Sequence, residues 1–230
     1  MAVTPGNTKL GRLIWCWSLP TLAIVCIGAT ELCKKLCYAM KGFFRMPSVK
    51  DAHYNNYELS LEEEFPQYVS MALSEVFARV VRVHVSGDFY DEAYVRKWLQ
   101  IVRRRPYIAF YAYTRSWRIP EMLPALKELA KEPNFFMWWS CDRDTGAPPR
   151  TKYARRAYLM ENDDDVAPYK VDLVFRDKST TVMKYDPKGN QVCPYDNGVT
   201  RTTCSQCKLC FERNPLPRKK AMQVLSLIHI

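Results

Sequence analysis

Four cysteines near the carboxyl end of the chain have the spacing of metal ligands. Three of them form a C-x2-C-x2-C run and the fourth lies eleven residues earlier, giving the set Cys193, Cys204, Cys207 and Cys210. Three thiols separated by two residues each are typical of ligands to a [4Fe–4S] cluster. Four thiolates also complete a zinc site, but zinc ribbons usually pair two separated C-x2-C motifs. The spacing therefore predicts a metal centre and favours iron–sulfur over zinc.

A second group of cysteines lies near the amino end. Cys26, Cys33 and Cys37 form a C-x6-C-x3-C pattern, with two lysines after Cys33. Nearby positive charge favours thiolates. Three thiolates on a four-iron cluster would leave one iron open to bind a substrate or cofactor, as open metal positions do elsewhere. The alternatives are a structural site shared with Cys16 and buried thiols without metal. We predict a cluster here.

Composition and charge suggest the compartment and the partner. The nine cysteines of this 230-residue chain are an odd number, which argues against a closed disulfide framework and for a reduced, cytoplasmic protein. The net charge of +10 favours a polyanionic partner, DNA or RNA. Simple solubility is the alternative explanation of the charge.

Two segments could mislead an interpretation of the fold. Residues 13–29 carry no charge and resemble a secretory signal or a membrane span, but they are short and are interrupted by Pro20 and Gly28. We therefore expect no membrane association. The last six residues, LSLIHI at 225–230, match the in-frame translation of a common sequencing adapter. We interpret them as an assembly artefact and exclude them from the fold.

Apolar periodicity predicts helices that alternate with strands. Helical spacing covers 67–80, 91–104 and 120–131, strand-like runs cover 81–85, 107–113, 135–140 and 171–175, and 46–66 has the composition of a connector. This alternation indicates βαβ units and a parallel sheet. We predict an α/β fold with a partial (βα) barrel-like parallel sheet, a Cys-rich N-terminal loop and a Cys-rich C-terminal segment. The expected domains are 1–190 and 191–224.

Three of the predicted strands end in polar residues. The ends are Ser86-Gly87-Asp88, Thr114-Arg115-Ser116 and Ser140-Cys141-Asp142. Ligands bind outside the carboxyl ends of parallel strands, so these ends predict a site on one rim. Ordinary turn chemistry is the alternative, because Gly, Ser and Asp are common turn residues. For Asp88 alone, a further alternative is to cap the following helix.

The motifs of the chain resemble a phage-borne family described as the gene product 88 domain. The resemblance rests on GNTKLG at 6–11, SLP at 18–20, C-x-GAT-x-x-C-x-x-x-CYA at 26–39, VSGDF at 85–89, FYAYTRS at 110–116 and CPYD…TC-x-x-C-x-x-CF at 193–211. These motifs span most of the chain.

The layout is also similar to that of radical S-adenosylmethionine enzymes, in which a three-cysteine loop precedes a partial (βα) barrel. In those enzymes a Gly-rich strand end with an acidic residue contacts the amino group of the cofactor. This resemblance implies S-adenosylmethionine as a cofactor, contacted by Ser86, Gly87 and Asp88, with Tyr113 and Ser140 lining the same mouth. It also implies that the C-terminal cysteines hold an auxiliary cluster.

Two hypotheses about function follow from these features. The first is an iron–sulfur enzyme, similar to radical S-adenosylmethionine proteins, that modifies a macromolecule, with nucleic acid favoured by the charge. The second is a non-enzymatic nucleic-acid-binding phage protein with structural zinc or iron–sulfur sites. The iron content of the protein discriminates between the enzyme and a zinc protein.

Overall fold

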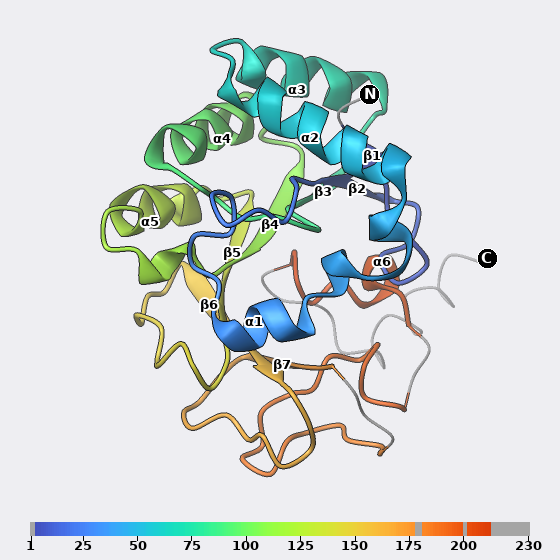
Figure 1. Ribbon diagram of the computed structural model, residues 1–230, viewed down its shortest axis with the longest axis vertical. Coiled ribbons are helices and arrows are strands. Elements are labelled where there is room, and N and C mark those ends of the chain that lie inside the picture. Colours follow the sequence, from blue (N-terminus) through green and yellow to red (C-terminus); the bar gives the residue numbers. More distant parts are fainter. Residues whose placement is uncertain (1–2, 178–180, 200–201, 213–230) are drawn as a thin grey trace, which may run out of the picture.

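A seven-stranded sheet forms the centre of the protein (Figure 1). The computed structural model describes residues 3–177, 181–199 and 202–212. In this part of the chain the strands lie side by side in their order along the sequence, and only the β1–β2 pair is antiparallel. They are β1 (Thr4–Pro5), β2 (Ile14–Trp17), β3 (Val80–Val83), β4 (Ala109–Thr114), β5 (Phe135–Cys141), β6 (Ala154–Met160) and β7 (Leu173–Arg176). The predicted α/β class and parallel sheet are confirmed.

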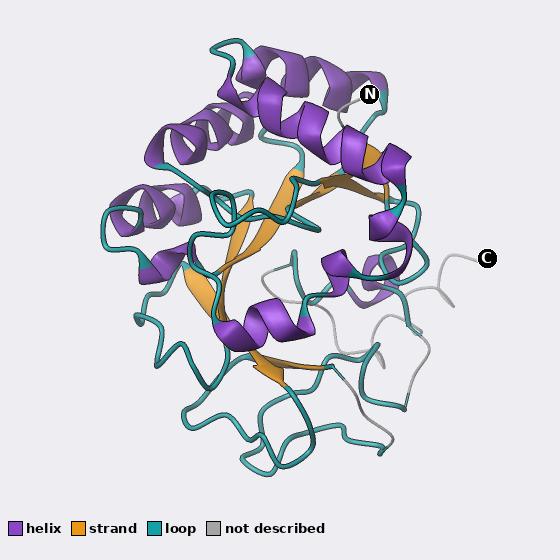
Figure 2. Ribbon diagram, viewed as in Figure 1, coloured by secondary structure: helices purple, strands orange, loops and turns teal. Residues whose placement is uncertain are grey.

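Three amphipathic helices cover one face of this sheet: α3 (Phe65–Glu75), α4 (Glu92–Arg104) and α5 (Leu123–Lys131). Figure 2 shows them together on the outer side of the strands. In α4, the Asp91 side chain accepts a hydrogen bond from the Tyr94 N–H at 2.6 Å and so caps the first turn. The apolar side of α4 packs into the main core with alternate residues of the strands.

The other face of the sheet is covered by the two ends of the chain. Residues 191–193 run beside β7, where the Cys193 N–H donates to the Val174 carbonyl at 2.8 Å. The short helix α6 (Cys204–Cys207) is tied to the amino end, because the Cys204 N–H donates to the Lys9 carbonyl at 2.9 Å. The Cys-rich C-terminal segment therefore lies against the sheet.

Several elements differ from the sequence-based expectations. The expected connector at 46–66 is largely a helix, α2 (Pro47–Leu61), which has a proline in its first turn. The Asn56 amide of this helix donates a hydrogen bond to the Ser18 carbonyl at 3.0 Å. The helix predicted to reach residue 80 ends at Glu75, because Phe77 has a positive φ of 49°. Strands β1, β2 and β6 have no counterpart among the sequence-based expectations.

The uncharged run 13–29 contains strand β2 and the chain that leads to helix α1 (Glu31–Leu36). In the part of the chain that the structure describes, no helix is both long and apolar enough to cross a bilayer. The proposed boundary near residue 190 stays a prediction, and residues 225–230 lie outside the described residues. Among the described residues, three short 3-10 helices complete the fold, at Tyr38–Met40, Gly42–Arg45 and Ser116–Arg118.

Strand β3 ends two residues earlier than predicted because His84 adopts a left-handed conformation with a φ of 66°. This turn directs His84 into the core, where its Nε2 lies 2.9 Å from the Tyr94 hydroxyl. The same hydroxyl accepts a hydrogen bond from Trp17 Nε1 at 2.9 Å. Burial, reinforced by the charge of Arg82, lowers the pKa of His84 to about 3.

We expect His84 to make the free energy of unfolding depend on pH. Its folded pKa lies below the value of about 6.5 that applies in the unfolded chain, so this stability is present above pH 6.5 and is lost as pH falls toward 3. Urea denaturation at pH 7 and pH 5 measures the loss. Asparagine tolerates positive φ, so His84→Asn should lose less stability between the two pH values than the wild type. An equal loss in both proteins would contradict this role.

Candidate metal and cofactor site

The N-terminal cysteines gather at the carboxyl ends of the strands. Cys33 lies on α1, Cys37 follows the helix, and the thiols of Cys26, Cys33 and Cys37 are within electrostatic reach of one another. Burial raises the pKa of Cys26 to about 12, and the nearby Asp88 carboxylate adds to the shift. Burial also raises the pKa of Cys33, while the Arg115 guanidinium opposes the shift. The Arg115 guanidinium also acts on Cys26, but it offsets only part of the rise in the pKa of that thiol.

Gly28 brings the cysteine loop against the end of β4. A Cβ atom at this position would lie 2.2 Å from the Arg115 carbonyl oxygen, so only glycine permits the contact. The Gly28 carbonyl accepts a hydrogen bond from Arg118 Nη1 at 2.9 Å. The glycine of the GAT motif is therefore required by close packing between the loop and the sheet.

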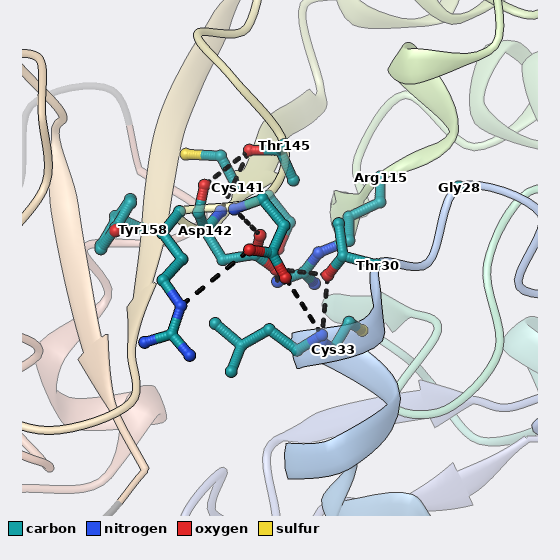
Figure 3. A network of polar contacts seen from close by, with 12 residues as sticks. Gly28, Thr30, Cys33, Arg115, Cys141, Asp142, Thr145 and Tyr158 are labelled. Atoms are coloured by element: carbon teal, nitrogen blue, oxygen red, sulfur yellow. Dashed lines mark hydrogen bonds and ion pairs between the residues drawn. The ribbon is translucent and has the colours of Figure 1, made fainter. Parts of the chain in front are cut away.

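A buried carboxylate at the end of β5 fixes helix α1 (Figure 3). Asp142 is fully buried and accepts hydrogen bonds from Thr30 Oγ1 at 2.7 Å and from Arg115 Nη2 at 3.0 Å. Thr30 in turn accepts from the Cys33 N–H at 3.0 Å as the N-cap of the helix. This chain of contacts links the backbone of Cys33 to two strand ends.

The predicted cofactor residues after β3 lie beside the same cysteines. Ser86 Oγ donates to the Leu19 carbonyl at 2.7 Å, and Gly87 has a φ of 79° that favours glycine. The Asp88 carboxylate accepts the N–H groups of Phe89 at 2.7 Å and Arg115 at 2.8 Å. It therefore links the ends of β3 and β4. The alternative in which Asp88 caps the next helix is wrong, because Asp91 caps α4.

The four C-terminal cysteines share one pocket. Cys193, Cys204, Cys207 and Cys210 line it together with apolar side chains that include Leu173 and Leu209. Burial raises the pKa values of Cys193 and Cys210 to about 12, and the Tyr113 hydroxyl beside Cys210 partly opposes the second shift. The pocket thus brings together all four cysteines that the sequence spacing selects.

Polar groups on the sheet surround this pocket. Trp138 Nε1 donates to the Cys210 carbonyl at 2.9 Å, and Arg155 donates to the Leu209 carbonyl at 2.8 Å. Arg82 Nε and the Tyr111 hydroxyl are buried and have no hydrogen-bond partner among the described residues. Arg82 lies near Cys204, and Tyr111 near Cys204 and Cys210. Unsatisfied donors beside a group of thiols fit a site for anionic sulfur.

The structure divides the predicted cofactor residues between two places. Ser86, Gly87 and Asp88 lie near the N-terminal cysteines, whereas Tyr113 lies on the sheet face near Cys210. The backbone carbonyl of Ser140 accepts a hydrogen bond from Trp117 Nε1 at 2.9 Å. Tyr113 stacks on Trp138 with ring centroids 5.6 Å apart. The five predicted cofactor residues therefore do not line one common site.

Two further residues, Cys16 and Arg82, lie near the C-terminal cysteines. Cys16 lies near Arg82 and Cys204, so it accompanies the C-terminal cysteines and not the N-terminal group. Arg82 was missed by sequence reasoning, although a charged residue in the apolar strand VVRV was a usable signal. Within residues 3–177, 181–199 and 202–212, no three or more His, Cys, Asp or Glu side chains are arranged to hold a metal ion.

Comparison with known proteins shows that the sequence of this chain is similar to phage proteins. The family described as "Gene product 88" matches residues 1–213. The "Gene 88 protein" of Mycobacterium phage L5 is 33% identical over 102 residues, which is 39% of this chain and 42% of that protein. The "Gene 88 protein" of Mycobacterium phage D29 is 30% identical over 131 residues, 52% of each chain. The aligned part spans about half the length of these relatives or less. No solved structure matches the chain.

We expect Asp142→Ala to destabilise the protein by about 3–5 kcal/mol, because it leaves the mostly buried Arg115 without its carboxylate. It also removes the acceptor that holds Thr30, so thiol reagents should modify Cys33 faster, as peptide mass spectrometry can show. Urea denaturation measures the stability. The exposed Asp51→Ala is the control and should change stability by no more than about 0.5 kcal/mol. Equal effects of both substitutions would show that the network does not hold α1.

Proposed function

The chain belongs to the gene product 88 family, and from that premise we propose that it is an iron–sulfur protein, similar to radical S-adenosylmethionine enzymes, that modifies nucleic acid. The observation that carries the proposal is the pocket lined by Cys193, Cys204, Cys207 and Cys210. The relatives are phage proteins. The proposed compartment is the host cytoplasm, where thiols stay reduced.

The spacing of the C-terminal cysteines favours a cluster over a single zinc ion. Three thiols separated by two residues each are typical of [4Fe–4S] ligands, whereas zinc ribbons usually pair two separated C-x2-C motifs. A four-iron cluster binds each thiolate at a different iron, so its ligands stand farther apart. Arg82 Nε and the Tyr111 hydroxyl are buried donors without partners among the described residues, and they would be available to donate to anionic sulfur there.

The N-terminal group would hold a second cluster with three thiolates. Cys26, Cys33 and Cys37 lie near one another at the rim, with Gly87 and Asp88 alongside. A four-iron cluster held there would supply single electrons and an open iron position for S-adenosylmethionine. The Asp142–Thr30 contact holds the Cys33 helix in place, and Gly87 lets the chain pass close to Leu19 and Val25.

The sheet supports the comparison with a partial (βα) barrel. Strands β2 to β7 are parallel and follow one another in chain order, and helices α3, α4 and α5 lie on one face. Such an order places the carboxyl ends of the strands on one rim, where ligands bind in barrels. The second candidate function is a non-enzymatic nucleic-acid-binding protein with structural zinc or iron–sulfur sites, which the net charge of +10 favours equally.

Protein purified without oxygen should contain iron and acid-labile sulfide in equal amounts. Cys204→Ser should lower both by about half, because one of two clusters is lost. Cys141→Ser is the matched control, since the Cys141 thiol donates to the Ala157 carbonyl at 3.2 Å inside the main core. Its iron content should equal that of the wild type. Stoichiometric zinc without iron would refute the proposal.

The cofactor has its own test. With dithionite as the electron donor, the reduced protein should release methionine from S-adenosylmethionine, and Cys33→Ser should abolish the release. Asp88→Asn should weaken S-adenosylmethionine binding, measured by calorimetry, if its carboxylate contacts the amino group. Iron and sulfide at wild-type levels without methionine release would leave an iron–sulfur protein and rule out the radical S-adenosylmethionine assignment.

A further inference from the structure

Large apolar side chains are exposed directly after the N-terminal cysteines. In the segment 38–46, YAMKGFFRM, the exposed fractions are 83% for Phe43, 58% for Met40 and 51% for Tyr38. The segment consists of two 3-10 turns before α2. Exposed apolar side chains that are grouped together usually mark an interaction site. We call this segment the aromatic loop.

The same region carries only positive charge. Between Glu31 and Asp51 the sequence contains five cations and no acidic residue. Lys34 and Lys35 pair with Glu31 and Glu161, but the other three cations are exposed and have no ion pair in the described part of the chain: Lys41, Arg45 and Lys50. Unpaired cations beside exposed aromatic rings are complementary to a nucleic acid, because the cations can contact phosphates and the rings can stack on bases.

The aromatic loop is fixed to the rim of the sheet. The Tyr38 hydroxyl donates to the Val85 carbonyl, next to Ser86, and accepts from Arg82 Nη2 at 3.3 Å. The Phe44 ring packs on Tyr38 at 5.7 Å and on His53 at 5.9 Å between ring centroids. In Figure 1 the loop joins α1 to α2, beside the open side of the sheet. A ligand on this loop would lie near Cys37 and the β3 end.

We propose that the aromatic loop binds single-stranded nucleic acid and brings it to the rim. Phe43 and the free side of Tyr38 stack on bases, and Lys41, Arg45 and Lys50 contact phosphates. A single strand is favoured over a duplex because exposed rings can stack only on unpaired bases. The modification of the bound strand at the rim rests on the proposed function, but the binding itself requires no cluster.

Fluorescence anisotropy with labelled single-stranded RNA and DNA oligonucleotides of mixed sequence tests the binding. Phe43→Ala should weaken binding about tenfold or more, the effect of losing one stacked base. Lys41→Ala combined with Arg45→Ala should weaken binding and reduce the slope of log affinity against log salt by about 1.4, or 0.7 for each phosphate contact. Duplex of the same sequence should bind more weakly than either single strand.

Matched controls lie on other surfaces. Tyr107→Ala removes a ring that is 87% exposed, and Lys127→Ala with Lys131→Ala removes two exposed cations near α5. Both controls should bind like the wild type. Equal losses in the controls, or no binding by the wild type, would overturn the inference. Phe43-dependent binding to phosphatidylserine vesicles, with none to oligonucleotides, would instead assign the loop to a membrane surface.

The same preparations separate this inference from the proposed function. Binding that depends on Phe43 in a protein without iron would support the loop and refute the iron–sulfur assignment. Iron and sulfide at the expected level, with no binding to any oligonucleotide, would refute the loop and leave the iron–sulfur assignment standing. Circular dichroism of each variant establishes that the fold is retained.

Discussion

The central sheet must be buried on both faces, and this requirement organises the rest of the protein. Parallel sheets are found covered on both sides because their strands are apolar on each side. Helices α3, α4 and α5 cover one face. The second face is covered by the chain ends, where Leu10 and Phe211 pack on Tyr111 and where Cys193 packs on Trp138. The C-terminal cysteines are therefore part of the packing of the sheet, and their burial follows from it.

Burial of thiols sets the chemical character of both cysteine groups. A thiolate in apolar surroundings is costly, so desolvation raises the pKa values of Cys26, Cys193 and Cys210. Arg115 near Cys33 and Arg82 near Cys204 offset only part of that cost. In the proposed function, a bound metal centre supplies the remaining positive charge and stabilises the thiolates.

The two cysteine groups are positioned by different means. The N-terminal loop docks on the rim through a few polar contacts and one close approach, in which Gly28 touches Arg115 and Thr30 bonds to Asp142. The C-terminal segment is instead held along its backbone, by Lys9, Trp138 and Arg155. This difference places one group at the rim of the sheet and the other against its face.

The sequence alone determined the alternation of helices and strands and the grouping of the cysteines. Helix α4 could be predicted almost to the residue, because its cap, its apolar spacing and its terminal arginines are all local signals. Helix α2 could not, because its low amphipathicity hides it and a tertiary contact from Asn56 helps to hold it. The position of Ser86, Gly87 and Asp88 after a strand could also be predicted, because the apolar alternation of 81–85 stops before them.

Only the tertiary structure decided which residues meet. The contact of Thr30 with Asp142 joins residues 112 positions apart, and that of Trp138 with Cys210 joins residues 72 positions apart. The resemblance to radical S-adenosylmethionine enzymes implies that Tyr113 lines the rim, but the alternation of side chains along β4 directs it to the face that carries Cys210. Local periodicity predicts which side of an element is buried. It does not determine which distant segment covers that side, because that depends on how the whole chain packs.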